Sequence, residues 1–390
     1  MLPFIPFALP DIDEKEINEV VESMKSGWLT TGPKVKQFEK DFAEFLGEDL
    51  NAISVNSATA GLHLVLEALG IGCGDEVLVP SHTFTATAEV VRYLGADPVF
   101  IDVDRKTLNI DPALVDALLS QRQAGNRGMP KALILVHFAG LPCDMSSLMK
   151  TARKYGLHVI EDAAHALPAT HGGRLVGTLG TDAVVYSFYA TKTITTGEGG
   201  MVVTKDPQIA DRCRMMRLHG ISRDAFDRYT SKRPAWYYEV VAPGFKYNMT
   251  DIAASIGIQQ LKKAWRFQQR RQQMAEYYSN ELKDMPLDLP SSARDGDIHA
   301  WHLYVARLRS ESGTSREHFI EAMMERGVGC SVHFIPLPLH PYWKSRYGYV
   351  EGAFANSVAE YRRSVSLPLY TKMTDDEVQR VVKTAREILT

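Results

Sequence analysis

The stretch AVVYSFYATKTITTGEGG, residues 183–200, joins an apolar strand to a polar, glycine-rich turn. Lys192 follows the strand, and parallel α/β sheets bind their ligands just beyond the carboxyl ends of their strands. Small and hydroxyl side chains around Lys192 leave room for a ligand, and Gly197, Gly199 and Gly200 allow close backbone approach. A lysine in a polar turn is usually only a solvated cation, so a functional interpretation needs support from other parts of the chain.

Short β-rich runs recur on both sides of this stretch, with helical patterns between them. Strands alternating with helices predict an α/β fold with a largely parallel sheet. Two helices are well marked, at residues 33–46 and 59–69, and each ends near a glycine. The seven β-rich runs are residues 53–55, 76–79, 99–103, 132–138, 157–160, 183–188 and 200–204.

The second half of the chain changes pattern after Thr250, a possible helix cap. Residues 250–283 predict a long helix or a bent pair, which we expect to link two domains. Beyond it come strand-like stretches at 302–308 and 328–334 and helices at 315–326 and 374–389. We therefore predict a large domain over residues 1–250 with an N-terminal arm, a linking helix over 251–284, and a smaller α+β domain over 285–390.

Composition excludes several classes of protein. Of the 390 residues, 45% are hydrophobic and 23% are charged, which is typical of a globular protein rather than a disordered one. The net charge of -3 disfavours nonspecific nucleic-acid binding, and no apolar run reaches the ~18 residues of a membrane helix. The apolar start lacks the basic region of a signal peptide, so we expect a cytoplasmic location. The four cysteines have no CxxC spacing, so we expect reduced thiols and no metal site.

A second candidate stretch is HVIEDAAHA, residues 158–166. Asp162 follows a predicted strand, and His165 lies three positions later. Acidic residues after a strand are often helix caps, and a buried histidine is often structural. The functional alternative is that Asp162 pairs with a cofactor's pyridinium nitrogen while His165 approaches the ring's phenolic oxygen.

A third stretch, SVNSATAGLHL at residues 54–64, contains a strand, a small-residue turn and a helix start. The free N–H groups of Ala58 and Thr59, with nearby hydroxyls, would suit a phosphate monoester, although ordinary helix caps look the same. No GxxxxGK[ST] or strand-linked GxGxxG motif occurs, which disfavours ATP and NAD. Phe84, after another predicted strand, could stack on a flat ring or pack in the core.

Taken in order, these motifs resemble the DegT/StrS family of sugar aminotransferases. The resemblance is near full length and includes SGWLTTGPKVKQFE (26–39), GCGDEVLVPSHTFTATA (72–88), GFKYNMTDIAASIG (244–257) and HAWHLYVARL (299–308). It implies a pyridoxal-phosphate enzyme of the aspartate aminotransferase fold (fold type I), with a seven-stranded, mostly parallel sheet in the large domain. It also implies a homodimer whose subunits share their active sites.

The resemblance implies roles for individual residues. Lys192 would form the Schiff base with pyridoxal 5'-phosphate and move the proton, while Asp162 pairs with the pyridine nitrogen. Phe84 would stack on the ring and His165 approach its phenolic oxygen. The implied phosphate ligands are Ala58, Thr59, Ser187 and, from the neighbouring subunit, Asn248. Many family members read GYNYRMSD where this chain reads GFKYNMTD, so Lys246 is the alternative to Asn248.

The implied substrate is a nucleotide-linked keto sugar, with glutamate as amino donor. The KYN form, the TTGPK loop and the HAWH segment most resemble the subgroup that makes UDP-4-amino-4-deoxy-arabinose, which predicts a 4-keto sugar. Trp28, Thr30 and Thr31 would contact the substrate, and Arg228, Lys232 and Arg233 are candidates for its diphosphate. Two alternatives remain: an aminotransferase acting on a small cyclic ketone or free amino acid, and a noncatalytic sensor with the same fold.

Overall fold

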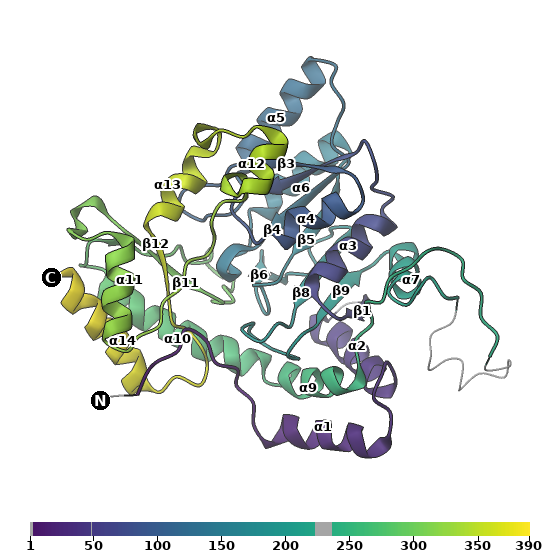
Figure 1. Ribbon diagram of the computed structural model, residues 1–390, viewed down its shortest axis with the longest axis horizontal. Helices are drawn as coiled ribbons and strands as arrows, with labels where there is room; N and C mark the ends of the chain where they lie inside the picture. The colour runs from purple at the N-terminus through teal and green to yellow at the C-terminus, as the bar shows by residue number, and fades with distance from the viewer. Residues whose placement is uncertain (1–2, 48, 223–235) are drawn as a thin grey trace.

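The computed structural model describes residues 3–47, 49–222 and 236–390 (Figure 1). A seven-stranded sheet in the order β1-β9-β8-β5-β4-β2-β3 forms its centre. Each of the seven predicted β-rich runs overlaps one of these strands. They are β1 (Asn51–Val55), β2 (Glu76–Pro80), β3 (Asp97–Ile101), β4 (Ala132–Val136), β5 (His158–Asp162), β8 (Ala183–Ser187) and β9 (Gly200–Thr204).

The sheet is mostly parallel, as expected. Strand β2 pairs in parallel with β3 and β4, β4 pairs with β5, and β5 pairs with β8. Only β9 runs against its neighbours, β1 and β8. Parallel neighbours bring the carboxyl ends of β4, β5 and β8 to one edge, where Val136 lies opposite Asp162 and Asp162 opposite Val185.

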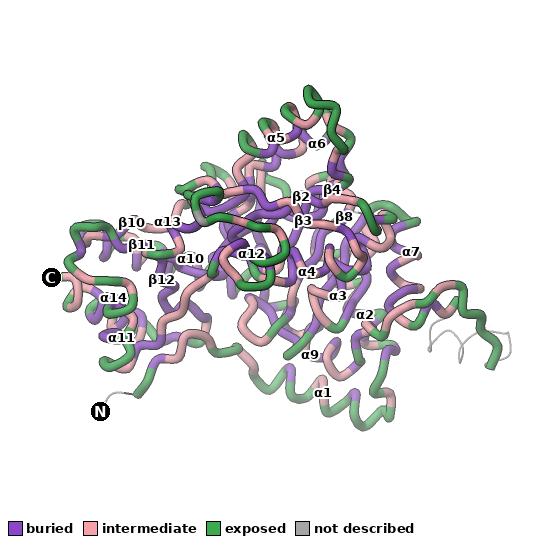
Figure 2. The backbone as a smooth tube through the Cα atoms, turned by 45° about the horizontal axis from the view of Figure 1, so that its top comes forward, coloured by how far each residue is buried: buried purple, intermediate pink, exposed green. Residues whose placement is uncertain are grey.

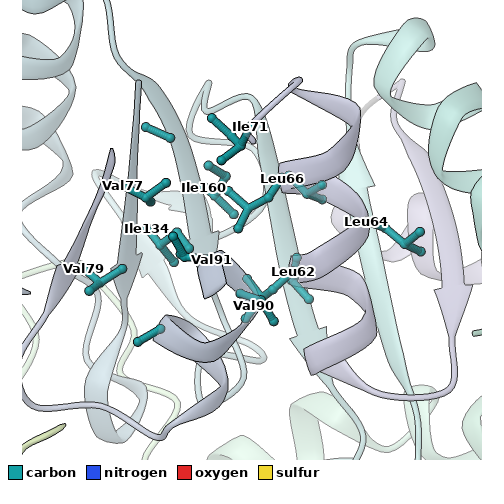
Figure 3. Packing of buried hydrophobic residues seen from close by; sticks show 14 of the residues in the cluster. Leu62, Leu64, Leu66, Ile71, Val77, Val79, Val90, Val91, Ile134 and Ile160 are labelled. Carbon is teal, nitrogen blue, oxygen red and sulfur yellow. The ribbon is translucent and has the colours of Figure 1, made fainter. Parts of the chain in front are cut away.

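Helices cover both faces of the sheet because side chains alternate along each strand. In β2, Val77 and Val79 pack into one apolar cluster with helices α3 (Ala58–Ala68) and α4 (Ala86–Tyr93). Leu78 packs into another cluster beneath α5 (Pro112–Ala124) and α6 (Met145–Tyr155). Figure 3 shows Leu62 and Leu66 of α3 directed at this first cluster. In Figure 2 the strands form the buried centre of the molecule, and exposed residues lie mainly on the outward sides of the helices.

The helices of the sheet layers agree closely with the sequence prediction. Helix α2 spans Pro33–Leu46, as expected, and α3 spans Ala58–Ala68, one residue earlier than expected. The region after Thr250 is a bent pair, α9 (Asp251–Leu261) and α10 (Ala264–Leu282). The other α-helices among the described residues of this part are α1 (Glu14–Ser26), α4 (Ala86–Tyr93), α5 (Pro112–Ala124), α6 (Met145–Tyr155) and α7 (Pro207–Met216).

A second, smaller unit follows α10. Its three-stranded antiparallel sheet has the order β10-β11-β12 and packs with helices in a separate apolar cluster. Ile5, from the beginning of the chain, is fully buried in this cluster. The elements are β10 (Leu287–Asp288), β11 (Tyr304–Leu308), α11 (Arg316–Glu325), α12 (Pro341–Tyr347), α13 (Ala355–Arg363), β12 (Ser364–Leu367) and α14 (Asp375–Leu389).

Two features of this unit differ from the sequence prediction. The predicted strand at 328–334 is wrong, because only single bridges form, from Val328 to Ile5 and from Ser331 to Ser366. The end of the segment turns instead toward a pocket, which His333 lines. The short strand β12 was not predicted. In addition, Trp343 and other side chains between residues 337 and 358 pack against the cluster of the large sheet.

The sequence predicted no metal site, no disulfide bonds and no membrane-spanning helix. Among the described residues, no group of His, Cys, Asp and Glu side chains could hold a metal ion. All four cysteines are free thiols. Within those same residues, none of the helices has the length and apolar character needed to cross a membrane.

Candidate active site

Lys192 lies five residues beyond the end of β8 and lines a pocket of about 440 Å³. The loop that carries it is closed at its base, because Thr196 N–H donates to Phe188 O and Phe188 N–H donates to Gly199 O, each at 2.9 Å. Within the loop, Gly197 has a φ of 82°, a conformation that favours glycine. The glycines of the GEGG run therefore close the loop that carries Lys192.

The Lys192 amine is electrostatically unusual. Burial lowers its pKa from 10.5 to about 8, and the nearby Asp162 carboxylate opposes this shift. Among the described residues the amine has no hydrogen-bond or ion-pair partner. At pH 7 about a tenth of such amines are uncharged, against about 0.03% for an ordinary lysine. The pocket thus keeps Lys192 closer to its nucleophilic form.

Asp162, the last residue of β5, lines the same pocket and is 6% exposed. Burial raises the pKa of its carboxyl group, against hydrogen bonds that favour the ionised form. These come from Thr87 Oγ1 at 2.9 Å and the Ala164 N–H at 3.2 Å. Asp162 does not cap a helix, so the structural alternative considered from the sequence does not account for it.

His165 is buried and also lines the pocket. Its Nδ1 accepts a hydrogen bond from the Ala139 N–H at 3.3 Å, which leaves the proton of the neutral ring on Nε2. Burial lowers the pKa of the ring well below its usual value, so His165 is a neutral donor at pH 7. Gly140 lies close to the backbone of His165, because a Cβ there would lie 2.8 Å from His165 O.

The N-terminus of α3 forms an anion seat in the pocket wall. Ser57 caps the helix by accepting from the Ala60 N–H, and Ala58, Thr59 and Ser187 line the pocket beside it. Gly200 of β9 packs directly beneath this turn, where a Cβ would lie 2.8 Å from Ala58 N. Free N–H groups at a helix N-terminus favour an anionic ligand.

Phe84 lines the pocket with 57% of its surface exposed, so it is not a core residue. Its ring meets Phe334 at 5.9 Å between centroids, with the planes tilted by 53°. An aromatic face open to a pocket suits a flat ligand. Of the two alternatives stated for Phe84, the structure excludes packing in the core.

The wall opposite the sheet contains residues that sequence reasoning did not assign to the site: Phe7, His302, His333 and Phe334. The His302 ring lies 4.3 Å from that of His165, and its buried Nδ1 has no hydrogen-bond partner. Burial lowers the pKa of His302 well below its usual value and that of His333 to about 4. The HAWH segment was the only sequence feature that could have assigned His302 to the site. No motif that we identified included Phe7.

Trp28, Thr30, Thr31 and Asn248 meet at another place, outside the residues that line the pocket. Asn248 Nδ2 donates to Thr31 Oγ1 at 2.8 Å, and Thr31 Oγ1 donates to Met249 O at 2.6 Å. Lys246 Nζ donates to Asn248 Oδ1 at 2.6 Å, so both candidates for a cross-subunit contact lie side by side. The three candidates for a diphosphate lie outside the described residues: Arg228, Lys232 and Arg233.

The residues of the pocket fit pyridoxal phosphate. The Gly200 position leaves a cradle at the α3 N-terminus for a phosphate, and a lysine with a lowered pKa lies close to a buried carboxylate. This fold and this site define the pyridoxal-phosphate-dependent aminotransferases of fold type I.

More narrowly, the chain belongs to the DegT/DnrJ/EryC1/StrS aminotransferase family, whose sequence profile matches residues 10–386. It is 45% identical over 388 residues to the spore coat polysaccharide biosynthesis protein SpsC of Bacillus subtilis, covering 99% of this chain and 97% of SpsC.

Solved structures support the same assignment. A Streptococcus pneumoniae protein assigned as a sugar aminotransferase, in its PMP form, superposes with a TM-score of 0.90 at 32% identity, covering 98% of each chain. The aminotransferase PseC of Helicobacter pylori, involved in the biosynthesis of pseudoaminic acid, has a TM-score of 0.87 at 27% identity and covers 99% of each chain. The protein is therefore a pyridoxal-phosphate-dependent sugar aminotransferase by family.

Proposed function

We propose that the protein transfers the amino group of glutamate to a nucleotide-linked 4-keto sugar. The observation that carries this proposal is the meeting of Lys192, Asp162 and the α3 N-terminus in one pocket. Family membership supports amino transfer to a sugar. The finer identity, an enzyme of the UDP-4-amino-4-deoxy-arabinose type, rests on the TTGPK, KYN and HAWH motifs of the sequence.

We assign the residues that hold the coenzyme as follows. The N–H groups of Ala58 and Thr59, with the Ser187 hydroxyl, bind its phosphate, because they form the anion seat of the pocket. Asp162 pairs with the ring nitrogen, and a buried carboxylate there keeps that nitrogen protonated. His165 donates from Nε2 to the phenolic oxygen. Phe84 offers an aromatic face for stacking.

When bound, pyridoxal phosphate supplies an aldehyde that takes up an amino group and a ring that accepts electrons. Lys192 supplies the acid–base chemistry. Its amine, with a pKa of about 8, removes the proton from the α carbon of glutamate and delivers a proton at the carbon that receives the amino group. A group with a pKa close to the working pH both accepts and donates a proton readily.

We further propose a homodimer in which Asn248 of each subunit binds the coenzyme phosphate of the other. Asn248 lies outside the pocket of its own chain, and its amide is held by Thr31. Trp28 Nε1 donates to Thr31 O at 3.1 Å, so Trp28, Thr30 and Thr31 belong to the same cluster, and we assign them to the substrate side of the shared site. Loss of coenzyme from Asn248→Ala, with Lys246→Ala as the comparison, tests the phosphate contact.

The two half-reactions test the proposed function separately. Glutamate should convert the purified protein to the pyridoxamine form and so remove its absorbance at ~410–430 nm. A nucleotide-linked 4-keto sugar should restore that absorbance. The panel consists of UDP-, dTDP- and GDP-linked 4-keto and 3-keto sugars, with a small cyclic ketone as the alternative acceptor.

Each outcome has a defined meaning. Return of the absorbance with the cyclic ketone alone contradicts the substrate class. Return with a 3-keto sugar alone contradicts the position of amination. A protein that never takes up pyridoxal phosphate would be a noncatalytic sensor.

A further inference from the structure

The beginning of the chain, residues 3–13, forms an extended segment that we call the N-terminal arm. Its first part joins the smaller unit. Ile5 is fully buried there, its N–H donates to Gly327 O at 2.9 Å, and its carbonyl accepts from the Gly329 N–H at 2.8 Å. Arg380 Nη1 also donates to Pro3 O at 2.6 Å. The arm therefore begins as a backbone partner of the segment at 327–329.

The other end of the arm is held at helix α9, which packs against the large sheet. Gln260 Nε2 of α9 donates to Asp11 O at 2.8 Å, and Lys263 pairs with Asp13 at 2.8 Å. Asp13 caps helix α1, which lies alongside α9 (Figure 1). Between Ile5 and Asp11 the arm therefore bridges the two units, with both ends fixed.

Phe7 lies in this bridge and lines the pocket that contains Lys192. Its ring stacks on His333 at 5.3 Å between centroids, with an interplanar angle of 28°. His333 is held in turn by Ser366 Oγ, 2.9 Å from its Nδ1. Phe4, on the same arm, is 52% exposed and does not line the pocket. The arm thus presents one of its two phenyl rings to the active site.

The chemistry of this wall distinguishes the two substrates. A phenyl ring backed by a neutral imidazole offers no charge to a glutamate carboxylate, which would lose hydration against it. A sugar ring has an apolar C–H face, and burying that face against an aromatic ring is favourable. The Phe7 side of the pocket therefore suits the sugar better than the amino acid.

We propose that Phe7 is a specificity-determining residue that packs on the sugar ring of the amino acceptor. This inference rests on the proposed function and adds the N-terminal arm to the substrate site. It follows that Phe7 contributes to binding of the acceptor and not to reaction with glutamate.

The test compares Phe7→Ala with Phe4→Ala, a matched loss of a phenyl ring from the same arm. Stopped-flow absorbance follows each half-reaction, and calorimetry measures binding of the aminated nucleotide sugar to the pyridoxal form. We expect Phe7→Ala to raise the Kd of the sugar product about 10- to 100-fold, while glutamate reacts within about twofold of the wild-type rate. Phe4→Ala should leave both measurements unchanged.

A second variant, Phe7→Leu, keeps apolar volume on the arm and removes the flat face. Phe7→Leu should fold normally and raise the Kd of the sugar product by a smaller factor, about threefold to tenfold. If Phe7→Ala is unstable, Phe7→Leu provides the test instead. Equal losses in both half-reactions, or no change in either, overturn the proposal. If the wild-type protein reacts with glutamate but with none of the nucleotide sugars, the proposed function is wrong. If the wild-type protein reacts with a nucleotide sugar and the Phe7 variants do not differ from it, only the proposal for Phe7 is wrong.

Discussion

The two walls of the pocket are built differently. The sheet wall consists of strand ends and the turns that follow them, with Asp162 and Ser187 as last residues of adjacent strands and Lys192 just beyond. The opposite wall is assembled from separated segments that contribute Phe7 and His302, among others. The first wall carries the groups for acid–base chemistry, whereas the second carries aromatic rings and neutral imidazoles. We infer that the sheet wall performs the reaction and that the opposite wall selects the ligand.

The strongest test of this division is Lys192→Ala. Because the amine serves both substrates, both half-reactions should fall by at least about 10³-fold. Lys150→Ala, at an exposed position, should retain full activity. The measurement is single-turnover absorbance with each substrate. Loss of only one half-reaction would mean that Lys192 does not act on both substrates.

The lowered pKa of Lys192 can be measured in coenzyme-free protein. Burial disfavours the charged form, so the reactive amine is present above about pH 8 and is lost by protonation below it. At pH 7 Lys192 should react with an amine-directed reagent on the order of 10²-fold faster than exposed lysines such as Lys150. Peptide mass spectrometry across pH 6 to 11 gives the midpoint. A midpoint near 10.5 would remove the electrostatic argument for the sheet wall.

Gly200→Ala tests the cradle beneath the anion seat. A Cβ there would lie within 3 Å of the backbone at Ser57, Ala58 and Tyr186, so the first turn of α3 must shift. We expect the Kd for pyridoxal phosphate to rise about 10- to 100-fold, as overpacking typically costs about 1–3 kcal/mol.

The control for this cradle is Gly72→Ala, because a Cβ at Gly72 meets open space. Absorbance titration with the coenzyme measures both variants, and thermal unfolding checks their folding. Equal affinities for the two variants would show that Gly200 does not shape the seat.

Ser366→Ala should have the smallest effect, and it probes the opposite wall. It removes the hydroxyl held 2.9 Å from His333 Nδ1, a hydrogen bond with a net value of about 1 kcal/mol. The KM for the sugar should rise about fivefold with little change in the glutamate half-reaction, and Ser366→Thr should restore it. A slower glutamate half-reaction would place His333 with the chemistry rather than with ligand selection.

Sequence patterns predicted the sheet wall because each of its parts, a strand and the turn that follows it, is one contiguous stretch of sequence. An apolar run followed by small and polar residues identified the strand ends that carry Asp162 and Lys192. The same reasoning was wrong for residues 328–334, whose apolar residues resemble a strand. The segment pairs with the N-terminal arm at a single point and then turns to the pocket. Local patterns contain no information about a partner that lies more than 300 residues away.

The amino-acid sequence by itself determined the order of strands and helices, the parallel sheet, and the positions of Lys192 and Asp162 at strand ends, because these depend on local periodicity and on turns. Only the tertiary structure decided that the arm carries Phe7 into the pocket, that His302 lies against His165, and that Asn248 lies outside its own chain's pocket. These arrangements depend on packing between distant segments and on burial. Burial is also the main cause of the lowered pKa of Lys192, on which the proposed chemistry depends.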